Sequence, residues 1–138
     1  QPQPGSPPAL DGLRVLVAED NAVNRVLLEK FLQSAPVELA FAGDGREAVA
    51  QFEAFAPDII LMDMSMPEMD GLEATRAIRA LARPQPAIVA LTANAFESDR
   101  EACLAAGMDE FMSKPVSRGK LLQLLGRLAP QAQSRRAG

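Results

Sequence analysis

The chain has 138 residues, 48% of them hydrophobic, and a net charge of −4 at pH 7, which fits one globular domain with a sizeable core. The acidic balance argues against a nucleic-acid-binding surface, and no apolar run approaches the roughly 20 residues that a membrane-spanning helix needs. Histidine is absent, which excludes histidine-based triads and histidine-ligated zinc within this chain. Cys103 is the only cysteine, so no internal disulfide can form; we expect a small side chain packed in a helix, in a reducing, cytoplasmic compartment.

Both ends of the chain differ in composition from its middle. Residues 1–10 hold four prolines and a glycine, which predicts a disordered linker or overhang. Residues 130–138 are small and polar with two arginines, which is typical of a flexible tail. The folded domain should therefore span residues 11–129.

Within these bounds, short β-type runs alternate with helical patterns. In chain order the expected elements are a strand at 13–20, a helix at 22–34, a strand at 37–42, a helix around Ala48, Val49 and Phe52, a strand at 58–63, a helix at 73–82, a strand at 87–92, a helix at 97–106, a strand at 110–114 and a helix at 117–128. Gly107 suits the position just after a helix end. Five βα units in a row predict an α/β fold, with a parallel sheet covered by helices on both faces.

Polar side chains stand where four of these strands end. The first strand ends in Glu19 and Asp20, the third in Asp63, the fourth in Thr92 and the fifth in Lys114. Ligands of open α/β sheets bind beyond the carboxyl ends of the strands, so these groups should converge at one edge. Each pair of carboxylates 4 Å apart repels by ~4 kcal/mol at an effective dielectric of ~20. One lysine cannot offset three acids, and a set of oxygen ligands with open positions suits Mg²⁺.

A carboxylate beside a bound Mg²⁺ is equipped to accept a phosphoryl group. Taken singly, an acid at a strand end is usually a solvated loop residue or a helix N-cap, Thr92 a strand-end cap and Lys114 a surface charge. The functional interpretation depends on the agreement of four strand ends. A dehalogenase-type phosphatase would need a second acid two residues after the nucleophile of the first strand, and Ala22 stands there.

Three segments, VLVAEDNAVNR, DIILMDMSMPEMDGLEATRAIR and ALTANAFESDREACLAAGMDEFMSKPV, closely resemble the receiver domain of two-component response regulators. The resemblance covers nearly all of the folded region, and the residues of these segments are most like those in receivers of hybrid sensor histidine kinases. It implies a flavodoxin-like (βα)5 three-layer sandwich whose five-stranded parallel sheet has the order 2-1-3-4-5.

The resemblance also implies a role for each matching residue. Asp63 resembles the phosphoacceptor, Asp20 a direct Mg²⁺ ligand, and Glu19 an acid that holds metal-bound waters; Mn²⁺ is a possible substitute metal. The roles implied for the remaining positions are a metal-ligating backbone carbonyl at Ser65, a lysine pairing with phosphoryl oxygens at Lys114 before a cis peptide bond to Pro115, a switch hydroxyl at Thr92, a switch aromatic at Phe111, a small residue at Ala93, and tuning of phosphate lifetime at Ser65 and Asn94. Phe111 could equally be a plain core residue.

The function implied by the resemblance is a phosphoacceptor module of a phosphorelay. It would receive phosphoryl groups from a histidine kinase domain, a histidine phosphotransfer protein, or both, and would contact neither nucleic acid nor membrane. It would be no enzyme toward external substrates, although it would catalyse its own phosphorylation and dephosphorylation. Its expected origin is the cytoplasmic part of a hybrid sensor kinase, itself a candidate enzyme; a stand-alone regulator or phosphate shuttle, and a phosphorylation-independent pseudo-receiver, are the alternatives.

Overall fold

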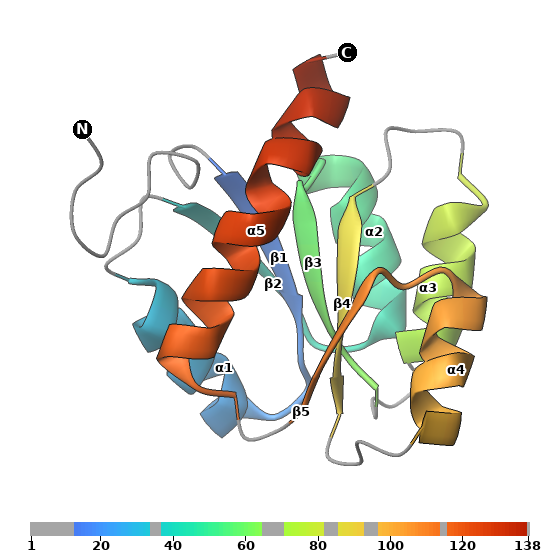
Figure 1. The fold of residues 1–138 in the computed structure, drawn as a ribbon, viewed down its shortest axis with the longest axis horizontal. Coiled ribbons are helices and arrows are strands. Elements are labelled where there is room, and N and C mark those ends of the chain that lie inside the picture. The colour runs from blue at the N-terminus through green and yellow to red at the C-terminus, as the bar shows by residue number, and fades with distance from the viewer. Residues whose placement is uncertain are drawn as a thin grey trace.

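The computed structural model describes residues 13–33, 37–64, 71–81, 86–92, 97–113 and 116–137. Five strands and five helices alternate along the chain (Figure 1). Their bounds are β1 Leu13–Ala18, α1 Ala22–Leu32, β2 Val37–Ala42, α2 Gly45–Phe55, β3 Ile59–Asp63, α3 Gly71–Arg79, β4 Ala87–Thr92, α4 Glu97–Ala106, β5 Glu110–Ser113 and α5 Arg118–Ala137.

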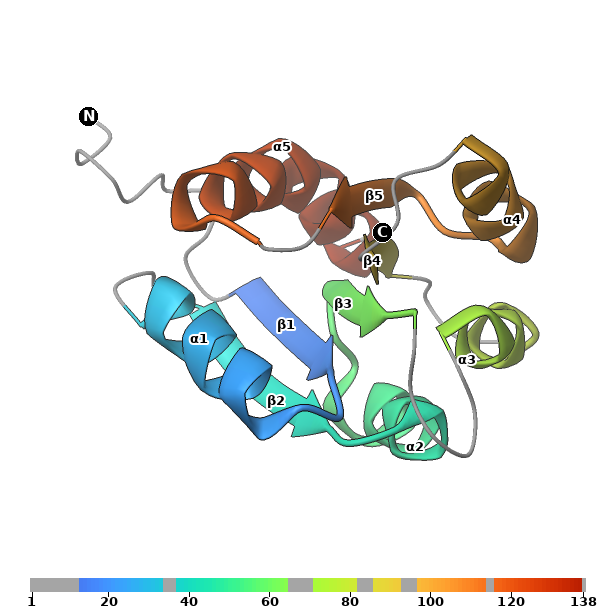
Figure 2. The same cartoon turned by 90° about the horizontal axis from the view of Figure 1, so that it is seen from below.

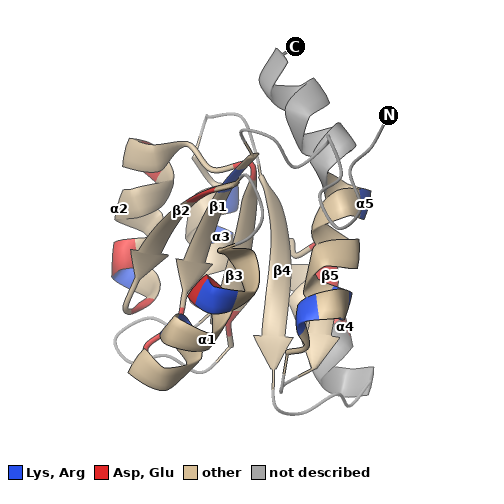
Figure 3. Cartoon of the chain, turned by 90° about the vertical axis from the view of Figure 1, so that its left-hand side faces the viewer, with Lys and Arg blue, Asp and Glu red and all other residues tan. Residues whose placement is uncertain are grey.

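The strands form one parallel sheet of order β2-β1-β3-β4-β5, which confirms the predicted fold class and strand order. The central strands β3 and β4 are buried along their whole length, as expected for strands with helices on both faces. Because all strands run the same way, their carboxyl ends lie at one edge of the sheet (Figure 3).

Helices cover the two faces of the sheet unequally (Figure 2). Leu28 and Leu32 of α1 pack with leucines of α5 against one face. Phe52 of α2, Ile78 of α3 and Cys103 of α4 pack against the other face. Cys103 is 1% exposed, which confirms the interpretation of this cysteine as a packed helical residue.

The predicted elements differ from the observed ones mainly at their ends. Gly107 has a φ of 110° directly after α4, the left-handed conformation that glycine tolerates best at a helix end. The predicted end of the last helix at Leu128 is wrong, since α5 continues to Ala137. The Ala, Gln and Arg residues there are good helix formers, so one proline does not end the helix; the flexibility of 130–138 stays a prediction.

A membrane-spanning helix would have to be both long and strongly apolar. Among the described residues, no helix meets these two conditions.

Candidate functional site: an acidic cluster at the carboxyl edge of the sheet

Three carboxylates lie together where β1 and β3 end. Pairing of Ala18 with Met62 sets the register of these neighbouring strands, so the residues that follow, Glu19 and Asp63, come side by side. One carboxylate oxygen from each of Glu19, Asp20 and Asp63 lies within 4.8 Å of the others. Glu19 is 1% and Asp63 3% exposed, whereas Asp20 is exposed. The sequence analysis predicted this convergence of acids.

This crowding is electrostatically costly without a cation. At a separation of no more than 4.8 Å and an effective dielectric of ~20, the buried pair Glu19 and Asp63 repels by about 3 kcal/mol or more. A hard divalent cation reverses the sign of this interaction, and carboxylate oxygens are the donors that Mg²⁺ prefers. The donor set and its spacing therefore fit Mg²⁺, with Asp20 providing the side open to solvent.

The cap of α1 also holds the side chain of Glu19, the first of the two acids that follow β1. The side chain of Asn21 caps the helix, since its Oδ1 accepts hydrogen bonds from the main-chain N–H groups of Val23 (2.9 Å) and Asn24 (3.1 Å). The main-chain N–H of Asn21 donates to Glu19 Oε2 at 3.2 Å. The sequence analysis gave Asn21 no role, although an asparagine just before an apolar helical pattern is a typical N-cap signal.

The start of α3 presses directly on the end of β3. A Cβ atom at Gly71 would lie 2.5 Å from the main-chain oxygen of Asp63 and 3.1 Å from the Cα of Met64. Both atoms belong to the backbone and cannot yield cheaply, so only glycine fits. Gly71 positions Asp63, and, like Asn21, it was given no role in the sequence analysis.

The structure describes only some of the other predicted site residues. Thr92 ends β4 and is 8% exposed. Its register partner is Ser113 of β5, which directly precedes Lys114 in the chain. Phe111 is half-buried and packs against the core on the α2, α3 and α4 face. The predicted residues outside the described part of the chain are Ser65, Ala93, Asn94, Lys114 and Pro115.

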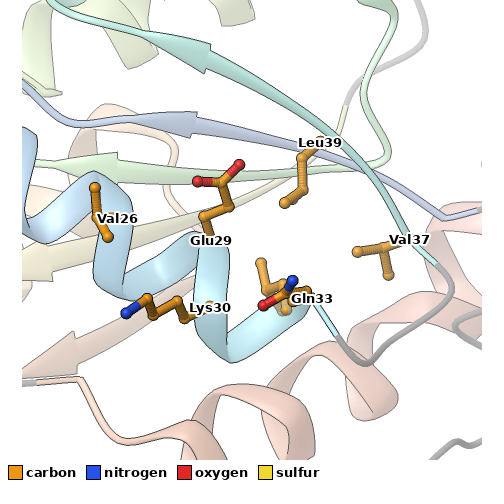
Figure 4. Close-up of a pocket in the computed structure, with 7 residues that line it drawn as sticks. Val26, Glu29, Lys30, Gln33, Val37 and Leu39 are labelled. Atoms are coloured by element: carbon orange, nitrogen blue, oxygen red, sulfur yellow. The ribbon is translucent and has the colours of Figure 1, made fainter.

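An apolar surface adjoins the acidic cluster on α1. Val23 is 74%, Val26 50% and Leu27 40% exposed, and together with Ala22 and Lys30 they line a shallow depression. We call these five residues the α1 patch. Further along α1, Val26 and Lys30 also border a groove against Val37 and Leu39 of β2 (Figure 4). Exposed contiguous apolar residues of this kind are typical of protein-binding surfaces.

The fold and the acidic edge are those of a phosphorelay receiver, and comparison with known families agrees. The response regulator receiver domain matches residues 15–126. The chain belongs to this family.

The similar proteins are receivers and larger kinases that contain one. The sensor histidine kinase RcsC of Salmonella typhi is 39% identical over 127 residues, which cover 92% of this chain and 13% of RcsC. The receiver domain of sensor histidine kinase PA1611 from Pseudomonas aeruginosa, described with a magnesium ion coordinated in its active-site cleft, is 42% identical with a TM-score of 0.80 over 86% of this chain and 98% of that one.

A third similar structure contains a partner. The receiver domain of Ssk1 from Saccharomyces cerevisiae, crystallised with the histidine phosphotransfer protein Ypd1, is 28% identical with a TM-score of 0.82, covering 89% of this chain and 93% of that one. Among the curated relatives, the chain spans only 6% to 17% of each protein's length.

Proposed function

We propose that this receiver domain accepts a phosphoryl group from phosphohistidine onto the carboxylate of Asp63, with Mg²⁺ bound at the acidic cluster. The observation that carries the proposal is the approach of three carboxylates to within 4.8 Å, two of them buried. The magnesium in the active-site cleft of the PA1611 receiver supports the choice of metal, and Mn²⁺ should substitute because it accepts the same oxygen donors.

In the proposed reaction an oxygen of Asp63 attacks the phosphorus of phosphohistidine in line with the leaving nitrogen. A P–O bond forms, the P–N bond breaks, and its electron pair leaves with the imidazole. The bound metal would supply charge neutralisation at the phosphoryl oxygens. Asp20 and Glu19 would hold that metal directly and through its waters, while Lys114 would donate to the phosphoryl oxygens.

Phosphorylation would then change the conformation near Thr92. The phosphoryl group brings more negative charge and more acceptor oxygens than the carboxylate it modifies. The Thr92 hydroxyl would turn to donate a hydrogen bond to it, and Phe111 would fill the space left behind. The face formed by α4, β5 and α5 would shift in population as a result, and hydrolysis of the acyl phosphate would reset it.

The α1 patch is the proposed docking surface for the phosphohistidine donor. It begins with Ala22, two residues after Asp20, so a helical partner seated there could bring its histidine to the acidic edge. Residues Ala22, Val23 and Asn24 at the start of this helix carry no charge, which lowers the desolvation cost of apolar docking. The complex of the Ssk1 receiver with Ypd1 supports a histidine phosphotransfer protein or a kinase domain as the partner.

We further propose that the parent protein is a hybrid sensor histidine kinase and that the domain works in the cytoplasm. The matched region forms a small part of curated relatives such as the sensor histidine kinase RcsC and the sensor protein GacS of Pseudomonas syringae. As an isolated module the domain would process no external substrate.

Phosphotransfer kinetics test both the chemistry and the docking surface. A phosphorylated histidine phosphotransfer protein should transfer to the wild type and not to Asp63→Asn. Val23→Asp should slow this transfer about 10-fold yet leave phosphorylation by acetyl phosphate unchanged, because the small donor needs no docking. Leu104→Asp is the matched control, since Leu104 is 52% exposed on α4. Equal slowing by both variants would contradict docking on α1.

A further inference from the structure

Glu19 forms hydrogen bonds with its neighbours through three groups: its main-chain N–H, its side-chain carboxylate and its main-chain carbonyl. Its main-chain N–H donates to the carbonyl of Ala42 at the end of β2 (2.9 Å), and its Oε2 accepts from the N–H of Asn21 (3.2 Å). Its main-chain carbonyl accepts a hydrogen bond from the side chain of Arg25, at 2.7 Å from Nε. Arg25, which makes this last contact, lies in α1 and is half-buried.

The carbonyl that Arg25 contacts lies in the peptide unit joining Glu19 to Asp20. Because a peptide unit is planar, holding its oxygen restrains the Cα positions of both acids. Mg²⁺ requires near-ideal octahedral geometry at about 2.0–2.1 Å, so a small rotation of this peptide would weaken its binding. The Arg25 contact is therefore placed to control the geometry of two of the three carboxylates.

Gly43, in the loop between β2 and α2, leaves the room that Arg25 needs. A Cβ atom at Gly43 would lie 2.8 Å from Nη2 of Arg25. The loop itself is held by a hydrogen bond from the N–H of Gly43 to Glu47 Oε1 (2.9 Å). A methyl group at this position would therefore crowd the end of the Arg25 side chain, which would have to shift to make room.

We propose that Arg25 is a positioning residue of the metal site: its Nε–H···O bond to the Glu19 carbonyl sets the orientation of Glu19 and Asp20 for Mg²⁺. The inference rests on the proposed Mg²⁺ site. The proposed positioning role of Arg25 and its positive charge have opposite effects on the affinity for Mg²⁺. A positive charge near three carboxylates repels a second cation, so loss of charge alone would tighten Mg²⁺ binding, whereas loss of positioning weakens it.

Two substitutions separate these effects. Glutamine places Nε2 as many bonds from Cα as Arg25 places Nε, so Arg25→Gln keeps a donor and loses the charge. Arg25→Met keeps a similar length and loses both. By calorimetric titration with Mg²⁺, Arg25→Met should bind about 5-fold more weakly than the wild type, the effect of losing one hydrogen bond, and Arg25→Gln within about 2-fold. Arg46→Met, which removes an exposed charge from α2, should leave the affinity nearly unchanged.

A second site and a second measurement keep the test independent of folding defects. Gly43→Ala crowds Nη2 at the flexible end of the Arg25 side chain, so it should weaken Mg²⁺ binding by less than Arg25→Met does. It should have no further effect in the Arg25→Met background, because both changes act through the same side chain. In the metal-free protein, the NMR shift of the Asp20 amide nitrogen, which belongs to the same peptide unit, should move in Arg25→Met and stay near the wild-type value in Arg25→Gln.

The outcomes distinguish the two proposals. Wild-type protein that fails to bind Mg²⁺ at millimolar concentration overturns the proposed metal site. A wild type that binds, together with an Arg25→Met variant that binds equally well or more tightly, overturns the positioning role of Arg25 and leaves the metal site standing.

Discussion

Replacing Asp63 with asparagine should stabilise the metal-free fold, although it removes the residue on which the function depends. The substitution keeps the side-chain shape and removes one charge from the acidic cluster. Repulsion between the buried pair Asp63 and Glu19, about 3 kcal/mol at their spacing, is relieved in full. Relief against Asp20 adds ~1 kcal/mol, because this residue is exposed and screened by water.

Part of this gain is offset by the predicted attraction between Asp63 and Lys114, which the variant also loses. We therefore expect a net increase of about 1–3 kcal/mol in the free energy of unfolding in EDTA, or roughly 4 °C in the melting temperature per kcal/mol for a domain of this size. Mg²⁺ opposes this gain, because a ligand at 100 times its Kd stabilises the wild type by about 2.7 kcal/mol and the variant by much less.

Urea unfolding followed by far-UV circular dichroism measures this effect, since the chain has neither tryptophan nor tyrosine. Asp58→Asn is the matched control: Asp58 precedes β3 at its other end, is 4% exposed and accepts a hydrogen bond from the N–H of Arg14 at 3.0 Å. It should give no gain in stability. An Asp63→Asn variant no more stable than the wild type in EDTA, or stabilised equally by Mg²⁺, would refute the reasoning on charge crowding.

Three further predictions concern packing, charge and the reaction, and the first two each include a control substitution. Gly71→Ala should lower stability by about 1–3 kcal/mol, because its Cβ would meet a backbone atom 2.5 Å away. Its control, Gly126→Ala in α5, should raise stability by ~1 kcal/mol, because no described atom lies within 4 Å of the added Cβ. Urea titration checks the sign of both changes. Arg79→Met removes hydrogen bonds to Gly107, Pro86 and Asp109 and should lower the free energy of unfolding by about 2–3 kcal/mol. Its control, Arg127→Met, should lower it by less than ~1 kcal/mol, because the ion pair of Arg127 is largely exposed. Lys114→Ala should retain Mg²⁺ binding in calorimetry but lose most phosphorylation by acetyl phosphate; a phosphorylation rate equal to that of the wild type would contradict the role given to this lysine.

The acidic cluster could be predicted from the sequence because parallel strands bring their carboxyl ends to one edge whatever the details of packing. The positions of Glu19, Asp20 and Asp63 follow from the alternation of elements alone. The strand order does not, since the same alternation fits other parallel sheets, and it came from the family resemblance. The end of α5 was missed because the small, polar composition of residues 130–138 is typical of a tail, while tolerance of a proline within a helix depends on the surrounding residues.

The residues that position the cluster were harder to predict because they act through the main chain. The residue type alone does not indicate that Gly71 lies against a carbonyl of β3, since a glycine at a helix start is common for other reasons. Arg25 bonds a carbonyl six residues earlier in the chain, a contact that depends on how α1 leaves β1. Asn21 was the exception, since an N-cap can be predicted from local sequence.

The measurement that tests the phosphoacceptor site most directly is the intact mass of the protein after incubation with acetyl phosphate and Mg²⁺, followed by peptide mapping. We expect the wild type to gain the mass of one phosphoryl group on the peptide that contains Asp63, and to gain none in EDTA. Asp63→Asn should stay unmodified. Labelling of the variant to the same extent, or labelling of the wild type that is unaffected by EDTA, would contradict a metal-dependent phosphoacceptor at Asp63.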